Sequence, residues 1–265
     1  MHAGARTGLG TAVSPSTRPR WPSASRTWAA PTGYLGKVHY GQDGAGDAGA
    51  PPHHGFDTTY YGVAGQQKGR LNYLRHCAAA VAEYGQFGAT TSAVQPMLEG
   101  ETEVELEGFL TDELGVRVRA FVSENAADGQ PFFLMLAFNA VHNFCWQLPA
   151  EELEKRNLPT HPDYRDGSED YLGRYDGQVS PNLEHDREND VAQLELMDRK
   201  VAGLLESLEE QGIADDTVVV YLRDNGGSNC NFADNTPLRG TKYTLWDGGI
   251  RVPCLLRWPG GGIPA

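Results

Sequence analysis

Three segments of the chain have the hydrophobic pattern of short strands. Residues 132–138 and 218–222 are continuous apolar runs, and residues 31–40 indicate a short strand that ends in polar side chains. Apolar runs of this length are typical of strands with both faces covered, and the run at 218–222 is also rich in β-branched valine. We therefore expect three strands, and we expect the strand at 218–222 to be buried on both faces.

Two longer segments carry apolar side chains at helical spacing. In residues 101–125 the acidic residues come early and the arginines late, which agrees with the helix dipole. Residues 187–211 carry a second apolar stripe, and Gly212 follows as a typical C-terminal cap. Strands and helices that alternate in this order build a mainly parallel sheet. We predict an α/β fold with a mostly parallel central sheet and helices on both faces.

Length and charge narrow the class of protein. The chain has 265 residues, which is enough for one large α/β domain with a sizeable core. Its formal net charge of −13 argues against a nucleic-acid partner, since such binding relies on clustered lysine and arginine. No stretch approaches the roughly 18 consecutive apolar residues of a membrane span. We expect no nucleic-acid partner and no membrane span.

The end of the strand at 218–222 carries the first candidate for chemistry. Asp224 and Asn225 follow the strand directly, and two glycines then turn the chain back. In open α/β sheets, ligands bind beyond the carboxyl ends of the strands. A carboxylate next to an amide carbonyl suits Ca²⁺ or Mg²⁺, which bind oxygen ligands. The same residue types also form ordinary turns, so both interpretations stay open here.

Longer sequence motifs decide between a metal site and an ordinary turn at Asp224 and Asn225. Residues 237–259 read PLRGTKYTLWDGGIRVPCLLRWP, residues 35–41 read LGKVHYG, residues 52–57 read PHHGFD, and residues 131–142 read PFFLMLAFNAVH. These four segments resemble the sulfatase family, whose corresponding patterns are close to PLRGGK-x-T-x-WEGGIRVP, GKWHLG, HGFD and a strand ending in PH, respectively. The resemblance covers roughly residues 31–265 and implies the alkaline-phosphatase-like fold, incomplete at both ends of this chain.

The resemblance also implies roles for the basic residues at the strand ends. Hydrolysis of a sulfate ester needs a nucleophile at sulfur, cations for the sulfate oxygens and an acid for the leaving alcohol. By resemblance, Lys37 and Lys242 bind the sulfate, His39 assists the nucleophile, and His142 lies at the leaving-group side. His39, His142 and Lys242 are therefore the predicted catalytic residues, and Lys37, Lys242 and His142 are the predicted substrate-binding residues.

Two parts of the family's chemistry are not visible in the sequence. By resemblance, Asp224 and Asn225 are two ligands of a Ca²⁺ or Mg²⁺ ion whose site begins with an earlier pair of aspartates, but no aspartate precedes Asp43. The family's nucleophile is a formylglycine made from a C/S-x-P-S/A-R motif. The nearest sequence here is VSPST at residues 13–17, with valine at the nucleophile position. We therefore expect the chain as given to lack sulfatase activity.

The first thirty residues differ in composition from the rest. They are rich in arginine, serine, proline and glycine and lack the apolar core of a secretory signal. The resemblance begins abruptly after them, which favours a truncated or mis-assembled reading frame. We divide the chain into an irregular or non-family segment, 1–30, and a partial sulfatase catalytic domain, 31–265.

Two other functions remain open. A phosphodiesterase or phosphonate hydrolase of the same superfamily uses a related site, but needs more histidine and aspartate ligands than this chain offers. A non-catalytic protein could bind a sulfated ligand through Lys37 and Lys242, and the missing nucleophile favours it. The expected ligand is a sulfated small molecule or glycan, and we expect residues 63–100 and 156–187 to set its specificity.

Overall fold

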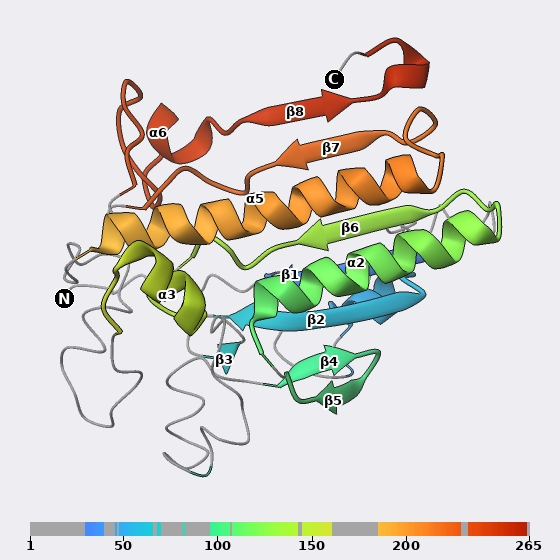
Figure 1. Cartoon of the computed structure of the whole chain (residues 1–265), viewed down its shortest axis with the longest axis horizontal. Coiled ribbons are helices and arrows are strands. Elements are labelled where there is room, and N and C mark those ends of the chain that lie inside the picture. Colours follow the sequence, from blue (N-terminus) through green and yellow to red (C-terminus); the bar gives the residue numbers. More distant parts are fainter. Residues whose placement is uncertain are drawn as a thin grey trace, which may run out of the picture.

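The computed structural model describes residues 30–39, 46, 48–65, 68–69, 82, 96–106, 108–142, 145–160, 185–228 and 233–263. In chain order the elements are β1 (Thr32–Val38), η2 (Pro51–His54), β2 (Thr58–Gly65), β3 (Lys68–Gly69), β4 (Met97–Glu99), β5 (Thr102–Val104), α2 (Leu110–Ala127), β6 (Phe133–Ala137), α3 (Ala150–Arg156), α5 (Asp186–Glu210), β7 (Val219–Leu222), α6 (Asp247–Ile250), β8 (Cys254–Arg257) and η4 (Pro259–Gly261) (Figure 1). The predicted segment 1–30 lies, apart from its last residue, outside these residues.

Three parallel strands form the centre of the main sheet. β1 lies in the middle, and its neighbours β2 and β6 both run parallel to it. The short strands β4 and β5 extend the sheet beyond β2 in antiparallel orientation, and β3 also pairs with β2. β1 is almost entirely buried, as is typical of a strand with parallel neighbours on both sides in an α/β sheet. The predicted α/β class is confirmed, with a sheet that is parallel at its centre and mixed as a whole.

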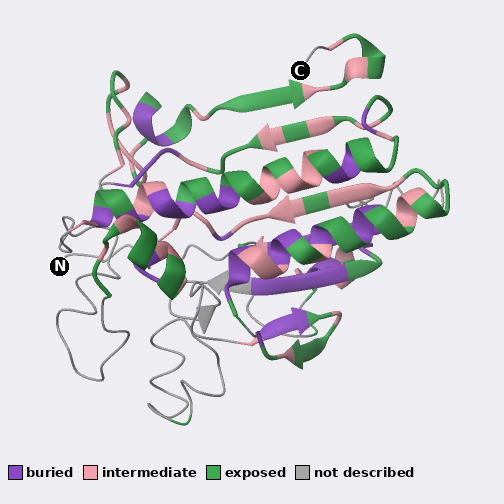
Figure 2. Ribbon diagram, viewed as in Figure 1, coloured by how far each residue is buried: buried purple, intermediate pink, exposed green. Residues whose placement is uncertain are grey.

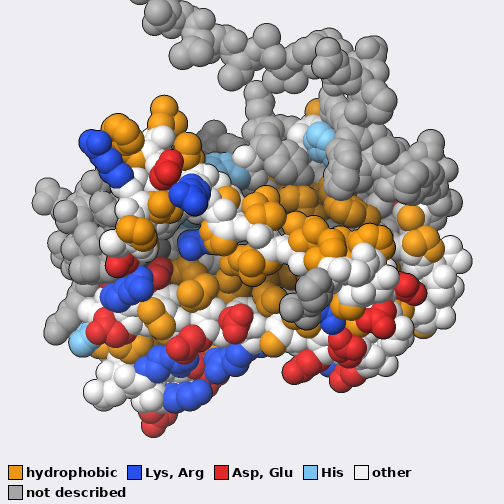
Figure 3. All heavy atoms as spheres, turned by 90° about the horizontal axis from the view of Figure 1, so that it is seen from above, with side chains coloured by type: hydrophobic (Ala, Val, Ile, Leu, Met, Phe, Trp, Pro, Cys, Tyr) orange, Lys and Arg blue, Asp and Glu red, His pale blue; other side chains and the backbone are white. Residues whose placement is uncertain are grey.

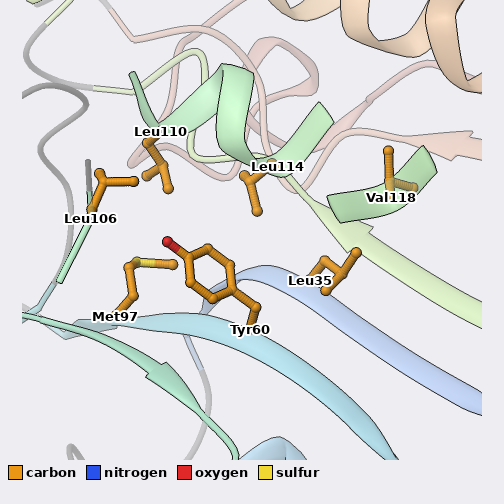
Figure 4. Close-up of a cluster of buried hydrophobic side chains, with 7 residues drawn as sticks. All are labelled: Leu35, Tyr60, Met97, Leu106, Leu110, Leu114 and Val118. Carbon is orange, nitrogen blue, oxygen red and sulfur yellow. The ribbon is translucent and has the colours of Figure 1, made fainter. Parts of the chain in front are cut away.

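Helix α2 packs its apolar side onto this sheet. Leu110, Leu114 and Val118 are spaced four residues apart, so they lie on one side of the helix, and they pack against Leu35 of β1 and Tyr60 of β2 (Figure 4). Leu110, Leu114 and Val118 are fully buried, and Figure 2 shows the buried stripe along the helix. Since burying one large apolar side chain contributes about 1.5–3 kcal/mol, this cluster holds α2 on the sheet.

Helix α5 contacts α2, and the two helices lie side by side (Figure 1). An ion pair joins them, with 2.6 Å between Lys200 Nζ and Asp112 Oδ1. On the other face of β1, Tyr34 packs edge to face against Phe56, which follows the turn η2. Both long helices of the described part of the chain thus belong to one layer. Within that part, no helix combines the length and hydrophobicity that crossing a membrane requires.

The predicted elements agree with the structure except at one helix start. The strand predicted at 132–138 and the helix predicted at 187–211 are confirmed as β6 and α5, and Gly212 follows α5 with a positive φ of 70°. The helix predicted over 101–125 begins later, at Leu110, so that prediction was wrong at its start. Gly100, with a φ of 61°, instead turns the chain so that Thr102–Val104 pairs with β4 as β5.

The strand predicted at 218–222 is present as β7, but its predicted burial on both faces is wrong. Val220 is 59 % exposed and Leu222 is 63 % exposed. β7 pairs antiparallel with β8 in a separate sheet, and within the described residues no ladder joins it to β6. Only its other side packs inward, where Val219 contacts a cluster that contains Val122 and Leu208. β7 stays partly exposed because its outer face has no covering layer within the described residues. Figure 3 shows hydrophobic side chains gathered across the face of the molecule seen from above.

Candidate active site

Two distant strand ends meet at the candidate site. Lys37 is the penultimate residue of β1 and His39 follows that strand, whereas Asp224 and Asn225 follow β7. Lys37 Nζ lies 3.7 Å from Asp224 Oδ2, and the lysine side chain is only 12 % exposed while that of Asp224 is 73 % exposed. A largely buried ammonium therefore lies beside a carboxylate that is open to solvent.

The backbone before Lys37 explains how this lysine is held. Gly36 has a φ of 115°, a conformation that side chains rarely adopt, and a Cβ at this position would overlap the carbonyl group of Ala137 on β6. Glycine thus lets β1 and β6 approach closely one residue before the lysine. The Tyr34 hydroxyl donates a hydrogen bond of 2.6 Å to the carbonyl oxygen of Lys37. Both contacts fix the backbone from which the Lys37 side chain extends.

His142 and Lys242 form the second pair of the site. The distance between Lys242 Nζ and His142 Nε2 is 2.8 Å. A lysine ammonium can only donate hydrogen bonds, so Nε2 of His142 is the acceptor and the ring hydrogen of the neutral imidazole resides on Nδ1. The histidine follows β6 and the lysine lies in the loop before α6, so the pair joins two further segments at the same site.

The loop that carries Lys242 is attached to the turn after Asn225. The backbone N–H of Lys242 donates to the carbonyl oxygen of Gly227 at 2.9 Å, and the Thr241 hydroxyl donates to the same oxygen at 2.6 Å. The Asn235 side chain also bonds Gly227, accepting from its N–H at 2.9 Å and donating to its carbonyl oxygen at 3.0 Å. The turn that follows Asp224 and Asn225 and the loop that carries Lys242 therefore fold against one another.

The electrostatics of this cluster act on His142. Removal from water lowers the pKa of His142 well below its ordinary value, and the electrostatic effects of Lys242, Lys37 and His39 lower it further. At neutral pH His142 is therefore an uncharged imidazole among cationic neighbours. Such a site favours an anion, because an anion offsets the repulsion between the two ammonium groups and stabilises a proton on the histidine.

A buried glutamine supports the His142 segment, and sequence reasoning missed it. Gln193 of α5 is fully buried, and its Nε2 donates to the carbonyl oxygens of Gln147 at 3.0 Å and Cys145 at 3.4 Å. Cys145 Sγ in turn lies 2.8 Å from the carbonyl oxygen of His142. An amide between the apolar positions Ala192 and Leu196 was the available signal, because a buried polar side chain needs a partner.

The described residues do not by themselves form a divalent metal site. Asp224 and Asn225 offer two oxygen ligands, but the Lys37 ammonium lies 3.7 Å from Asp224 Oδ2. The Asn225 amide nitrogen donates to the carbonyl oxygen of Gly226 at 2.8 Å. Among the residues that the structure describes, no group of three or more histidine, cysteine, aspartate or glutamate side chains could hold a metal ion. Ca²⁺ and Mg²⁺ need more oxygen ligands than this pair provides.

Two sets of predicted residues fall wholly or largely outside the described part of the chain. They are the sequence VSPST at 13–17, whose likeness to the formylglycine motif we attribute to chance, and the segments expected to set specificity, 63–100 and 156–187.

Comparison with known proteins adds independent evidence. Residues 30–264 match the family model described as Sulfatase. A "Sulfatase" of Formosa agariphila is 31% identical over 178 residues, covering 63% of this chain and 28% of that protein. The "Steryl-sulfatase" of Mus musculus is 30% identical over 160 residues, covering 57% of this chain and 20% of that protein. The chain thus spans less than a third of these relatives.

A solved structure shows the same fold over most of the chain. The crystal structure of Ps i-CgsB in complex with k-i-k-neocarrahexaose superposes with a TM-score of 0.68 at 28% sequence identity, covering 89% of this chain and 46% of that one. The putative sulfatase yidJ from Bacteroides fragilis superposes with a TM-score of 0.56 at 16% identity, which supports the fold alone. On the family match over residues 30–264, the chain belongs to the sulfatase family.

Proposed function

We propose that the cluster of Lys37, Lys242 and His142 binds the sulfate group of a sulfate ester, and that this domain belongs to a sulfuric ester hydrolase. The observation that carries the proposal is the 2.8 Å contact between Lys242 and a neutral His142, with Lys37 close enough to lower the same pKa. Two ammonium groups around one partly buried imidazole repel one another. A tetrahedral anion between them offsets that repulsion and accepts hydrogen bonds from both lysines.

The state of His142 indicates how it takes part. The leaving alcohol of a sulfate ester needs a proton, which a neutral imidazole cannot donate from Nε2. A bound sulfate group raises the pKa of His142 toward its ordinary value, because the anion offsets the charges of Lys242 and Lys37. Sulfate binding thereby favours protonation of His142, and the imidazolium can donate this proton to the ester oxygen. His39 stays the proposed residue that assists the nucleophile.

Asp224 and Asn225 stay proposed ligands of a Ca²⁺ or Mg²⁺ ion that would need further oxygen ligands. No step above depends on that ion. The substrate class that we propose is a sulfated small molecule or glycan, and the similarity to a protein crystallised with k-i-k-neocarrahexaose supports a saccharide.

For the polypeptide of residues 1–265 we propose binding without turnover. Its sequence offers no C/S-x-P-S/A-R motif that could supply a formylglycine. The loss of a covalent nucleophile costs several orders of magnitude in rate. The lysines and His142 would then stabilise charge around the ester without breaking its bond to sulfur.

Calorimetry with 4-nitrophenyl sulfate tests this proposal, combined with an assay of nitrophenol release. We expect binding, no release of nitrophenol, and at least about tenfold weaker binding by the Lys37→Met variant, because a charge-assisted hydrogen bond is lost. The control is Lys200→Met, which removes a lysine paired with Asp112 between the helices and leaves the site intact. Tighter binding of 4-nitrophenyl phosphate, or equal binding by Lys37→Met, would contradict the proposal.

A further inference from the structure

Tyr243, the residue after Lys242, has a backbone conformation that suits glycine. Its φ is 75°. The backbone N–H of Thr244 donates to the carbonyl oxygen of Thr241 at 3.0 Å, which closes a four-residue turn with Tyr243 in its third position. A positive φ at that position is typical of a type II turn, which favours glycine or asparagine there. For a bulky side chain this conformation is an outlier.

The other described non-glycine residues with a positive φ lie at helix ends. Asn157 is the C-terminal cap of α3, and His185 is the N-terminal cap of α5. Asparagine commonly takes the left-handed conformation at the C-terminal end of a helix, as Asn157 does here. Tyr243 adjoins no helix end, so the turn retains a strained aromatic residue where glycine would fit. Strain of this kind concentrates at functional sites.

The Tyr243 side chain lies next to the proposed sulfate site. The side chain is 60% exposed. The centre of its ring lies 5.3 Å from Lys242 Nζ, the atom that contacts His142. A largely exposed ring therefore borders the proposed sulfate site. Trp246 on the same loop is also exposed, and the guanidinium of Arg239 lies over its ring at 3.8 Å, as the Lys242 ammonium lies over the ring of Tyr243.

We infer that Tyr243 is a specificity-determining residue whose ring packs against the cyclic group that carries the sulfate. The preferred ligands are then sulfate esters of an aromatic or pyranose ring, and small acyclic sulfates lack this contact. Aromatic rings pack favourably on such groups, and one contact of this kind is worth about threefold to tenfold in affinity. This inference rests on the proposed function, because Tyr243 acts only if Lys37 and Lys242 bind the sulfate group.

Calorimetry with two ligands separates the two proposals. Methyl sulfate tests the anion site alone, and 4-nitrophenyl sulfate tests the anion site together with the ring contact. For Tyr243→Gly we expect about threefold to tenfold weaker binding of 4-nitrophenyl sulfate and unchanged binding of methyl sulfate. We expect Tyr243→Phe to bind both ligands like the unaltered chain. Leu245→Ala is the matched control, since Leu245 is 90% exposed on the same loop.

Thermal unfolding adds a readout that a purely structural role would not produce. Because glycine suits a positive φ, we expect the melting temperature of Tyr243→Gly to equal or exceed that of the unaltered chain while its binding of 4-nitrophenyl sulfate weakens. Tyr243→Asn, which also tolerates this backbone, should behave in the same way. A lower melting temperature with equal weakening for both ligands would assign Tyr243 a structural role and overturn the inference.

Unchanged binding of 4-nitrophenyl sulfate by Tyr243→Gly would also overturn it while leaving the proposed function intact. If neither ligand binds the unaltered chain, the proposed function fails and the inference about Tyr243 fails with it.

Discussion

Replacing Gly36 by alanine should disturb the contact between β1 and β6 next to Lys37 of the candidate site. Gly36 has a φ of 115°, and a Cβ at this position would overlap the carbonyl group of Ala137 on the neighbouring strand β6. The contact is with backbone, so no side chain can rotate away to relieve it. β1 must instead shift relative to β6, and Lys37 shifts with it because it is the next residue.

The loss of stability expected for Gly36→Ala follows from two effects. An unfavourable φ for a residue with a Cβ costs about 1–3 kcal/mol, and forced displacement in a packed core costs about 1–3 kcal/mol more. We therefore expect Gly36→Ala to lower the free energy of unfolding by about 2–6 kcal/mol. Because each kcal/mol shifts the melting temperature of a chain of this size by about 2–4 °C, the fall should be on the order of 10 °C.

Thermal unfolding followed by circular dichroism measures this effect, and Gly203→Ala is the matched control. Gly203 lies inside α5, and the nearest atoms to a Cβ there are 4.0 Å away, on Arg119. Since alanine favours a helix interior more than glycine does, Gly203→Ala should raise the free energy of unfolding by about 0.5–1 kcal/mol. The reasoning about Gly36 would be refuted by a Gly36→Ala variant that melts at the same temperature as the unaltered chain.

Three further predictions concern the core, His142 and its support. Leu114→Ala should lower the free energy of unfolding by about 2–5 kcal/mol in urea titrations, whereas Val116→Ala, at an exposed position on the same helix, should change it by less than about 0.5 kcal/mol. Because the folded pKa of His142 is lowered, the unfolded chain gains a proton first as the pH falls below about 6.5, so stability declines with falling pH. His142→Gln should reduce that decline between about pH 7.5 and about pH 5.5, and an equal decline in both proteins would contradict the sign. Gln193→Leu leaves the carbonyl groups of Cys145 and Gln147 without this donor, and a urea titration should show a loss of about 1–3 kcal/mol.

Local patterns predicted the elements best where one periodic signal dominated. β6 and α5 follow from a continuous apolar run and a long helical stripe, and neither depends on distant residues. The start of α2 could not be predicted in this way, because the apolar positions at 104 and 106 fit a helix as well as a strand. Gly100 and the pairing of β5 with β4 decided for the strand, and that pairing is a tertiary contact.

Exposure and side-chain partners depended still more on long-range structure. The valines of β7 indicate a strand, but their burial depends on which strands and helices cover them. The resemblance to sulfatases placed Lys37, His142 and Lys242 at one site, and the structure brings them near each other. Their catalytic and binding roles stay predictions. The bond from Gln193 to the turn after His142 joins residues 46 positions apart, so no local pattern could identify it.

The most direct test of the central claim is nuclear magnetic resonance of the His142 ring nitrogens during titration with 4-nitrophenyl sulfate. Our account predicts that the free protein shows a neutral imidazole with its hydrogen on Nδ1, since Nε2 accepts from Lys242. It also predicts that the bound sulfate raises the pKa of His142, so that the resonances move toward those of an imidazolium. Saturation with ligand while the His142 resonances stay unchanged would contradict the claim that the sulfate binds between Lys37 and Lys242.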